Sequence, residues 1–287
     1  MNYTNKYNIP EHICSWLAAD EYDYLPGVYS ATTLISPARA FILKKRNAEN
    51  LTMDYSDFIK MRMGTAIHDS LEKIGVYADG DFKEKRFFAE IMGCQISGKM
   101  DAVLGGVIRD NKSTSVWKYV KKEFDDYIKQ LSIYRWILYR NGINTEQYAF
   151  IDFFFTDWKK SDAEKSSDYP QIPYQEQKID LLSLEATEEL ICDRLEEFTF
   201  AESVLPECTA EELWQRDECW AVFTKEGQAR AKKLCKTEEE AKEYASANGC
   251  KHIEHRPGKA VRCGYCSAAP FCDQCKEMQK KGLVDLE

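Results

Sequence analysis

The residues best suited to chemistry are two aspartates and a lysine that flank a pair of glycines. Gly105 and Gly106 fit a two-residue hairpin turn, and counting outward from them places Asp101 opposite Asp110. Directly opposed side chains on neighbouring strands lie about 5 Å apart, where like charges are destabilising. Residues two apart on a strand share a face, so Lys112 accompanies Asp110. The pattern predicts a cation between the carboxylates, and hard oxygen ligands suit Mg²⁺ or Mn²⁺.

Such a site has a defined chemistry. A bound Mg²⁺ or Mn²⁺ keeps water ligands that can act as nucleophiles. The lysine can orient or deprotonate the attacking water, or stabilise negative charge that develops on a phosphate. The alternative is a surface hairpin with scattered charges.

Further polar residues could complete the site. His68 lies on an expected amphipathic helix over residues 56–74, and Gly64, one turn earlier, lets another element approach closely. Gln130 and Tyr134 are four apart and share a helix face, as core-edge residues or as substrate contacts. Glu84 begins the first strand and either faces the site or is solvated.

A second group of residues is typical of a metal site. Cys263, Cys266, Cys272 and Cys275 lie within thirteen residues, in a chain with eleven cysteines. Thiolates at this spacing bind Zn²⁺ or an iron–sulfur cluster. The sequence therefore predicts a metal-binding C-terminal segment.

The elements that position these residues follow from periodicity and turn signals. We expect a helix interrupted at Pro37 over residues 30–46, the helix over 56–74, three strands over 84–112, a helix over 117–140, a strand over 148–157, a loop with a further strand over 158–178, and helices near 183–203 and 225–247. This order predicts a mixed α/β core at 30–203, an N-terminal extension at 1–29 and a C-terminal region at 204–287.

Composition limits the classes of protein. The net charge is −9, yet residues 225–281 carry a basic excess, so a nucleic-acid partner is not excluded. No apolar run reaches the roughly 20 residues of a membrane span, and the start lacks a signal peptide. We expect a cytoplasmic protein with reduced cysteines and no membrane partner.

Taken together, the motifs resemble the PD-(D/E)XK nuclease superfamily, in its RecB-like exonuclease branch. The motifs occur in the family's order as GxxxH from Gly64 to His68, GxxD from Gly98 to Asp101, DxK from Asp110 to Lys112, and QxxxY from Gln130 to Tyr134. The resemblance implies a restriction-endonuclease-like core, with a mixed central sheet flanked by helices and a helical, cysteine-rich appendage. It also implies site roles: metal ligands His68, Asp101, Asp110 and the Asn111 carbonyl, catalytic Lys112, and DNA-positioning Gln130 and Tyr134.

The cysteine cluster extends the resemblance. Relatives of this kind join three C-terminal cysteines to one upstream cysteine around a [4Fe–4S] cluster, and Cys263, Cys266 and Cys272 match the C-terminal three. The usual upstream position is occupied by Ser36, before Pro37. Three cysteines could serve as the fourth ligand: Cys14, Cys208 or Cys275. A site closed by Cys275 would favour Zn²⁺.

The implied function is a divalent-metal-dependent DNA nuclease, most simply an exonuclease, in DNA recombination, repair or processing. The chain is similar to CRISPR-associated and phage single-domain nucleases, and we favour the phage type, which would act in the host cytoplasm. A recombination or replication protein could be a partner. The alternatives are a catalytically inactive nuclease-fold module that binds DNA or protein, and a zinc-ribbon interaction protein.

Overall fold

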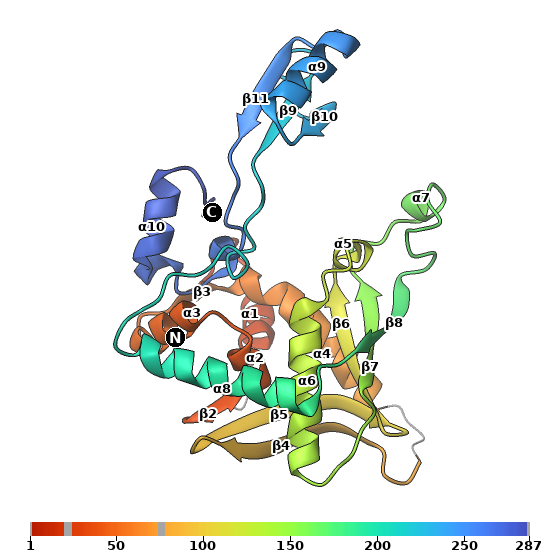
Figure 1. Cartoon of the computed structure of the whole chain (residues 1–287), viewed down its shortest axis with the longest axis vertical. Coiled ribbons are helices and arrows are strands. Elements are labelled where there is room, and N and C mark those ends of the chain that lie inside the picture. Colours follow the sequence, from red (N-terminus) through yellow and green to blue (C-terminus); the bar gives the residue numbers. More distant parts are fainter. Residues whose placement is uncertain (1, 20–24, 74–77, 286–287) are drawn as a thin grey trace. The chain divides into compact units, whose positions relative to one another are not determined.

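The computed structural model describes residues 2–19, 25–73 and 78–285, and the chain forms two compact units. The sheet unit comprises residues 2–36 and 52–200. The cysteine unit comprises residues 37–51 and 201–287. Each is described by itself below (Figure 1).

The sheet unit is a mixed α/β structure with a central mixed sheet flanked by helices. Its strands are β1 (Asn2–Thr4), β2 (Val28–Ser30), β3 (Thr52–Asp54), β4 (Phe82–Ile91), β5 (Cys94–Leu104), β6 (Val107–Thr114), β7 (Tyr148–Phe155) and β8 (Tyr174–Asp180). Its helices are α1 (Glu11–Ala18), α2 (Ala31–Leu34), α4 (Ile59–Glu72), α5 (Val116–Val120), α6 (Asp125–Arg140), α7 (Lys160–Ala163) and α8 (Leu184–Ala201), with a 3₁₀ turn at Tyr55–Phe58. The six-stranded sheet has the order β2-β5-β6-β7-β8, with β4 on the other edge of β5, and β1 pairs separately with β3.

The long strand β5 changes partner along one edge. Near its C-terminal end it pairs with β6, from Leu104↔Val107 to Ala102↔Arg109. Its N-terminal part pairs instead with β2, at residues 95–97. Meanwhile β6 continues in parallel with β7 as far as Thr114↔Phe155. The two strands of the hairpin therefore diverge beyond Ala102 and Arg109, which opens a space inside the sheet.

The Gly105–Gly106 turn is present, and its two φ angles of 57° and 76° explain why glycine occupies both positions. The predicted three strands are also confirmed, although β4 begins at Phe82. The predicted helix over 117–140 is wrong as a single helix: α5 ends at Val120 and α6 begins at Asp125. Lys122 between them has a φ of 57°, which no α-helix accommodates.

Helix α6 supplies much of the core. It packs across β4 and β5 (Figure 1) and buries Leu131, Ile133, Trp136 and Ile137 completely or nearly so. Helix α4 packs near β6, where a Cβ on Gly64 would lie 3.6 Å from Ser113 Cβ. The amphipathic helix predicted over residues 56–74 implies a buried apolar face, but on α4 Ile59 and Met63 are 39% and 54% exposed. Positions 74 and 75, at the end of the predicted helix, lie outside the described residues.

The cysteine unit contains an inserted small sheet. Its elements are α3 (Ala38–Arg46), β9 (Cys219–Phe223), β10 (Lys233–Cys235), α9 (Glu238–Asn248), β11 (His252–Arg256) and α10 (Asp273–Lys280), with 3₁₀ turns at Arg262–Tyr265 and Ala269–Phe271. The predicted break at Pro37 is confirmed, since α3 starts directly after it. The predicted helix near 225–247 is wrong in its first half. That stretch contains β10, and α9 starts only after Thr237, whose side chain accepts a hydrogen bond from Glu240 N.

Small residues and cysteines dominate one core of the cysteine unit. The buried cluster contains Leu43, Leu213, Ala260, Cys263, Ala268, Ala269, Cys272, Cys275 and Val284. Large aliphatic side chains are few in this cluster, so it buries little apolar surface beyond its alanines and cysteines. Within the described part of the chain, no helix is both long and apolar enough to cross a membrane.

Candidate functional site

The divergence of β5 and β6 builds the candidate active site. The pairing of β5 with β6 ends at Ala102↔Arg109, one pair before Asp101 would meet Asp110. Freed from the ladder, Asn111 N donates a hydrogen bond of 2.7 Å to Asp101 Oδ2. Asp101 and Asp110 nevertheless lie close enough for the charge of Asp110 to raise the pKa of Asp101. The structure thus brings the two aspartates together through a splayed hairpin rather than as a paired rung.

Glu84 completes the acidic group from the other edge of β5. The register Lys83↔Ala102 and Lys85↔Met100 puts Glu84 opposite Asp101. Its φ of 45° lies in the left-handed region, a costly conformation that persists in proteins mainly at functional sites. Sequence reasoning left Glu84 undecided, because a positive φ in a strand has no sequence signal for a glutamate.

His68 joins Glu84 and Asp101. Its Nδ1 lies 3.4 Å from Asp101 Oδ2 and 3.7 Å from Glu84 Oε1. One ligand atom from each of these three residues falls within 4.8 Å of the other two. Lys99 also reaches the group, with Nζ 2.6 Å from Glu84 Oε2.

The electrostatics of this group oppose loss of the protons of Asp101 and His68, but not that of Glu84. Burial, and then the charge of Asp110, raise the pKa of Asp101 to about 7. The interaction with Glu84 raises the pKa of His68 despite the opposing effect of burial. The pKa of Glu84 is lowered: burial acts against this, but His68 and Lys99 outweigh it. A buried cluster with this balance is suited to exchange protons for a cation.

The buried Asp110 and the partly exposed Lys112 form an ion pair beside the group. Lys112 Nζ lies 2.7 Å from Asp110 Oδ2, and the Asp110 side chain is only 1% exposed. Burial acts to lower the pKa of Lys112, but the charges of Asp110 and Asp101 raise it well above its usual range. Lys112 is therefore an ammonium at neutral pH.

The residues present fit a divalent cation. The donors are carboxylate oxygens and an imidazole nitrogen, which suit Mg²⁺ or Mn²⁺. In the described residues, Asp110 Oδ2 is buried and has no well-oriented hydrogen-bond donor, although Lys112 is close. A carboxylate oxygen next to one ammonium keeps a further lone pair that a bound cation could take.

Gln130 and Tyr134 lie together on α6, as their spacing predicts. Gln130 Nε2 donates a 2.8 Å hydrogen bond to Tyr134 Oη, and both residues are more than nine-tenths buried. Glycine at position 98 of β5 lets α6 approach this strand closely. A Cβ at this position would lie 2.7 Å from Tyr134 Cδ1, so only glycine fits without a shift.

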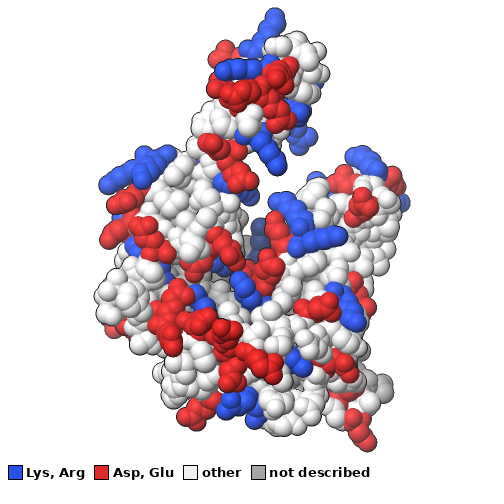
Figure 2. Space-filling model, viewed as in Figure 1, with Lys and Arg blue, Asp and Glu red and all other residues white. Residues whose placement is uncertain are grey.

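A basic and aromatic patch follows β6. Two lysine ammonium groups lie near the ring of Tyr127: Lys112 Nζ is 5.4 Å and Lys118 Nζ is 4.2 Å from its centroid. The two ammoniums are therefore at most about 10 Å apart. Trp117 beside Lys118 is 53% exposed, and basic side chains gather over α5 (Figure 2). Acidic side chains gather instead over α8 (Figure 2).

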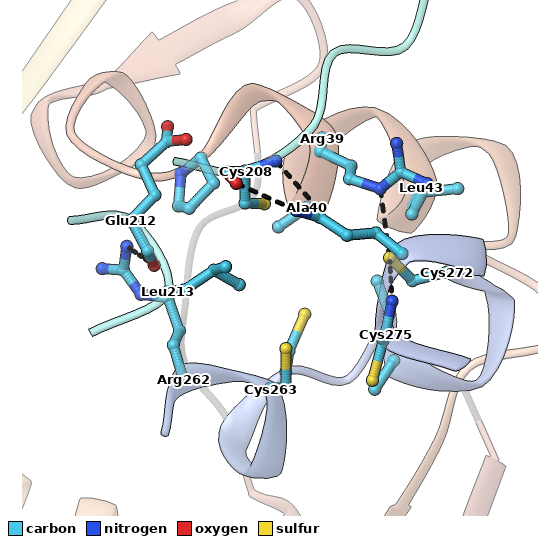
Figure 3. Close-up of a pocket in the computed structure, with 15 residues that line it drawn as sticks. Arg39, Ala40, Leu43, Cys208, Glu212, Leu213, Arg262, Cys263, Cys272 and Cys275 are labelled. Carbon is cyan, nitrogen blue, oxygen red and sulfur yellow. Dashed lines mark hydrogen bonds between the residues drawn. The ribbon is translucent and has the colours of Figure 1, made fainter. Parts of the chain in front are cut away.

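The cysteine unit contains its own candidate site. Five cysteines line a cavity of about 30 Å³, together with Arg39 and Arg262 (Figure 3): Cys208, Cys263, Cys266, Cys272 and Cys275. In Figure 3 the sulfur atoms of Cys208 and Cys272 lie on different sides of this cavity. Cys14 belongs to the sheet unit, where its thiol donates to Ile9 O at 3.3 Å, and it does not line the cavity.

Cys208 is held in place by the C-terminal motif. Gln274 Oε1 accepts a hydrogen bond from Cys208 N, and Gln274 Nε2 donates to Cys208 O, both at 2.9 Å. Burial raises the pKa of Cys208 to about 12, and the pKa of Cys275 is raised to about 12 for the same principal reason. These thiols lose their protons at neutral pH only when a metal replaces them.

The chain matches no protein-family model and no curated protein sequence. Among solved structures, a protein described as SSO0001 is similar over 65% of this chain and 85% of its own, with 16% identity and a TM-score of 0.46. An alkaline exonuclease from Laribacter hongkongensis is similar over 67% and 95%, with 14% identity and a TM-score of 0.37. A phage-related exonuclease from Haemophilus somnus is similar over 56% and 70%, with 14% identity and a TM-score of 0.28. These overlaps are distant and partial, so the proposal below depends on the residues of this chain.

Proposed function

We propose that the chain is a divalent-metal-dependent DNA nuclease of the RecB-like PD-(D/E)XK type. The observation that supports it most is the convergence of His68, Glu84 and Asp101 within 4.8 Å, next to the Asp110–Lys112 pair. A surface hairpin with scattered charges would not bury these groups. The inactive-module alternative gains no support, because each charged position of the motif set is occupied.

Each residue has a proposed role. His68, Glu84, Asp101 and Asp110 would hold Mg²⁺ or Mn²⁺, with the Asn111 carbonyl as a further candidate ligand. When bound, such an ion supplies an activated water and stabilises charge on the phosphate. Lys112 donates hydrogen bonds as an ammonium, which favours stabilisation of developing negative charge over deprotonation of water. Gln130 and Tyr134 would position the DNA strand.

We propose that the substrate strand passes over α5. Lys118 makes no ion pair with any carboxylate in the described ranges, and it shares the Tyr127 ring with Lys112. An unpaired ammonium this near the reacting centre is suited to a neighbouring phosphate, and the exposed Trp117 indole is suited to stacking on a base. We therefore propose single-stranded DNA, or the frayed end of a duplex, as the species that enters the site. This favours exonuclease action in phage-type recombination or processing.

We propose an iron–sulfur cluster, rather than Zn²⁺, in the cysteine cavity. Tetrahedral Zn²⁺ would bring its four sulfurs to about 3.8 Å of one another. Among the described residues no three thiols come within 4.8 Å of each other, and they surround a cavity instead. A cluster binds each sulfur through a different iron and so needs a wider spacing.

The ligands we favour are Cys263, Cys266, Cys272 and Cys208. The Cys208 thiol is influenced by the charges of Cys272 and Cys266, and Gln274 fixes its backbone. Cys275 is influenced by the same two thiols and also interacts with the Cys263 thiol, so the choice of Cys208 depends on its backbone being fixed by Gln274. A Cys208→Ser variant should therefore lose the cluster's visible absorption, whereas Cys275→Ser should keep it; the reverse result would assign Cys275.

Cleavage of linear and circular DNA tests the nuclease proposal. With Mn²⁺, the protein should release nucleotides from an end-labelled linear strand and leave a closed circle intact. Cleavage of the circle would replace the exonuclease by an endonuclease. No cleavage of any DNA, with Mn²⁺ bound at the site, would favour the inactive binding module.

A further inference from the structure

In the described part of the chain, Arg39 is a buried cation that forms no ion pair with a carboxylate. The residue lies on α3 and is 8% exposed. Its Nε donates a 3.1 Å hydrogen bond to Cys272 Sγ, and its Nη1 donates a 3.0 Å hydrogen bond to Pro206 O. Within residues 2–19, 25–73 and 78–285 it forms no ion pair. The cavity that Arg39 lines also holds Glu212, which accepts a hydrogen bond from Thr209 N. Since a guanidinium keeps its charge in proteins, an anion closer to it in this cavity would stabilise it.

The sulfur of Cys272 is the place where that anion is expected. Two N–H groups point at it, because Cys275 N also donates to Cys272 Sγ, at 3.4 Å. Cys272 is at the same time the N-cap of α10, where the helix end favours negative charge. A sulfur that accepts hydrogen bonds from a guanidinium and from a helix N-terminus is well placed to be a metal ligand, since both contacts favour negative charge on it.

We infer that Arg39 is the charge partner of the metal–thiolate group in the cysteine cavity, a positioning residue that fixes Cys272 and offsets part of the group's negative charge. This inference rests on the metal–thiolate group proposed above. Because the guanidinium is compensated only when the thiolates are present, Arg39 stabilises the loaded cysteine unit and destabilises the metal-free one. Its hydrogen bond to a ligand sulfur also favours the reduced state of a cluster, since reduction adds negative charge.

A comparison of thermal stability tests whether Arg39 stabilises the loaded protein and destabilises the metal-free protein. Full-length wild type and Arg39→Gln are prepared loaded, by anaerobic reconstitution with iron and sulfide, and metal-free, by chelation. The substitution should lower the thermal midpoint of the loaded protein and speed iron loss to a chelator at least tenfold. In the metal-free protein it should leave the midpoint unchanged or raise it. A residue that only packs would lower both midpoints, and that result would overturn the inference.

Two further variants separate charge from position. Arg262 lines the same cavity but donates to Glu212 O at 3.0 Å and stacks on Trp214, so Arg262→Gln removes a nearby charge without touching Cys272. It should leave iron retention within twofold of wild type. Arg39→Lys keeps the charge and should recover most of the iron retention, even if Arg39→Gln folds poorly. An Arg262→Gln effect equal to that of Arg39→Gln would contradict the specific pairing.

The reduction potential gives a readout that does not depend on nuclease activity. At a fixed solution potential, the ratio of reduced to oxidised cluster should be about tenfold lower in Arg39→Gln, which corresponds to about 59 mV for one electron. An unchanged potential together with unchanged iron retention would refute the inference while leaving the cofactor proposal intact. Elemental analysis of the wild type decides the cofactor first: if it takes up no metal, the cofactor proposal fails and the inference fails with it.

Discussion

At the scale of residues, the site consists of charges that the fold holds together against their repulsion. The repulsion between Asp101 and Asp110 is offset when a cation or protons compensate their negative charges. Lys112 provides one compensating charge. The sequence motifs predict these three residues, because spacing on a hairpin determines which side chains share a face. Glu84 could not be predicted in the same way. Its place depends on a left-handed φ inside a strand, which only the folded sheet imposes.

The affinity for Mn²⁺ should depend steeply on pH. The pKa values of Asp101, at about 7, and of His68 are both raised, so the folded metal-free protein holds protons that Mn²⁺ must displace. Affinity should fall about tenfold per pH unit below pH 7 for each proton displaced. By the same linkage, the raised pKa of Asp101 makes the metal-free protein less stable as pH rises from about 4 through 7, and the raised pKa of His68 adds a further loss above its ordinary value of 6.5. Calorimetric titration with Mn²⁺ between pH 5.5 and 8.5 checks the prediction, and an affinity that does not vary would contradict it.

Replacement of the lysine should separate chemistry from metal binding. Lys112→Gln removes the ammonium beside Asp110, so the rate of DNA cleavage should fall at least about 100-fold. Mn²⁺ should bind no more weakly, because Asp110 loses a competing partner. Single-turnover cleavage and Mn²⁺ titration of the same preparation give both values. Loss of Mn²⁺ binding in parallel with cleavage would instead make Lys112 a structural residue.

At the scale of elements, the divergence of β5 from β6 creates the site, and the approach of α6 closes it. The hairpin register was predictable from Gly105 and Gly106, but the end of the ladder was not, because it depends on β2 and β7 pairing with the two strands separately. The sequence singled out Gly64 as the point of close approach. In the structure Gly98 has that role, because Tyr134 packs directly over it.

Alanine at the two motif glycines should therefore have opposite effects. A Cβ at Gly98 would meet Tyr134 and Ile137, so Gly98→Ala should destabilise the protein by about 1–3 kcal/mol and reduce cleavage. A Cβ at Gly64 meets only Ser113 at 3.6 Å, so Gly64→Ala should be neutral or stabilise by up to about 1 kcal/mol, as alanine favours a helix. Urea unfolding of both variants measures the difference. Equal destabilisation by the two substitutions would contradict the close packing of α6 on Gly98.

The patch on α5 should contribute to DNA binding through charge. If Lys118 contacts a phosphate, Lys118→Gln should reduce the slope of log affinity against log salt for single-stranded DNA by about 0.7. Binding is measured with Asp110→Asn protein, so that no cleavage occurs. The matched control is Lys178→Gln. Lys178 on β8 also places its ammonium over a tyrosine ring, 3.7 Å from the centroid of Tyr148 on β7, but it does not belong to the α5 patch. An equal change in both variants would remove the patch from the proposed DNA path.

At the scale of the molecule, two units have different sources of stability. The sheet unit has a core of large side chains such as Trp136, Phe153 and Met100, whereas the cysteine core consists mainly of alanine and cysteine. Composition and periodicity predicted the mixed α/β class and the cysteine-rich region. They missed the inserted sheet of β9, β10 and β11, because its strands are only three to five residues long. The predicted boundaries at residues 30 and 203 stay a prediction.

Removal of the metal that we propose for the cysteine cavity should therefore affect one unit selectively. Without it, amide hydrogens of residues 259–285 should exchange at least tenfold faster, because thiols and alanines alone provide little burial. Strands β5 to β7 should keep their protection. Hydrogen exchange of loaded and chelated protein measures both regions in one experiment. Equal loss of protection in the sheet would show that the metal stabilises the whole chain.

The most direct test of the central claim is Mn²⁺ binding and DNA cleavage by Asp101→Asn, compared with wild type and with Glu176→Gln. Glu176 is a carboxylate of the same sheet that pairs with Arg109 on another strand, so its removal controls for loss of charge. Wild type and Glu176→Gln should bind Mn²⁺ with similar affinity and cleave DNA. Asp101→Asn should bind at least tenfold more weakly and leave the DNA intact. Undiminished Mn²⁺ binding and cleavage by Asp101→Asn would contradict the account.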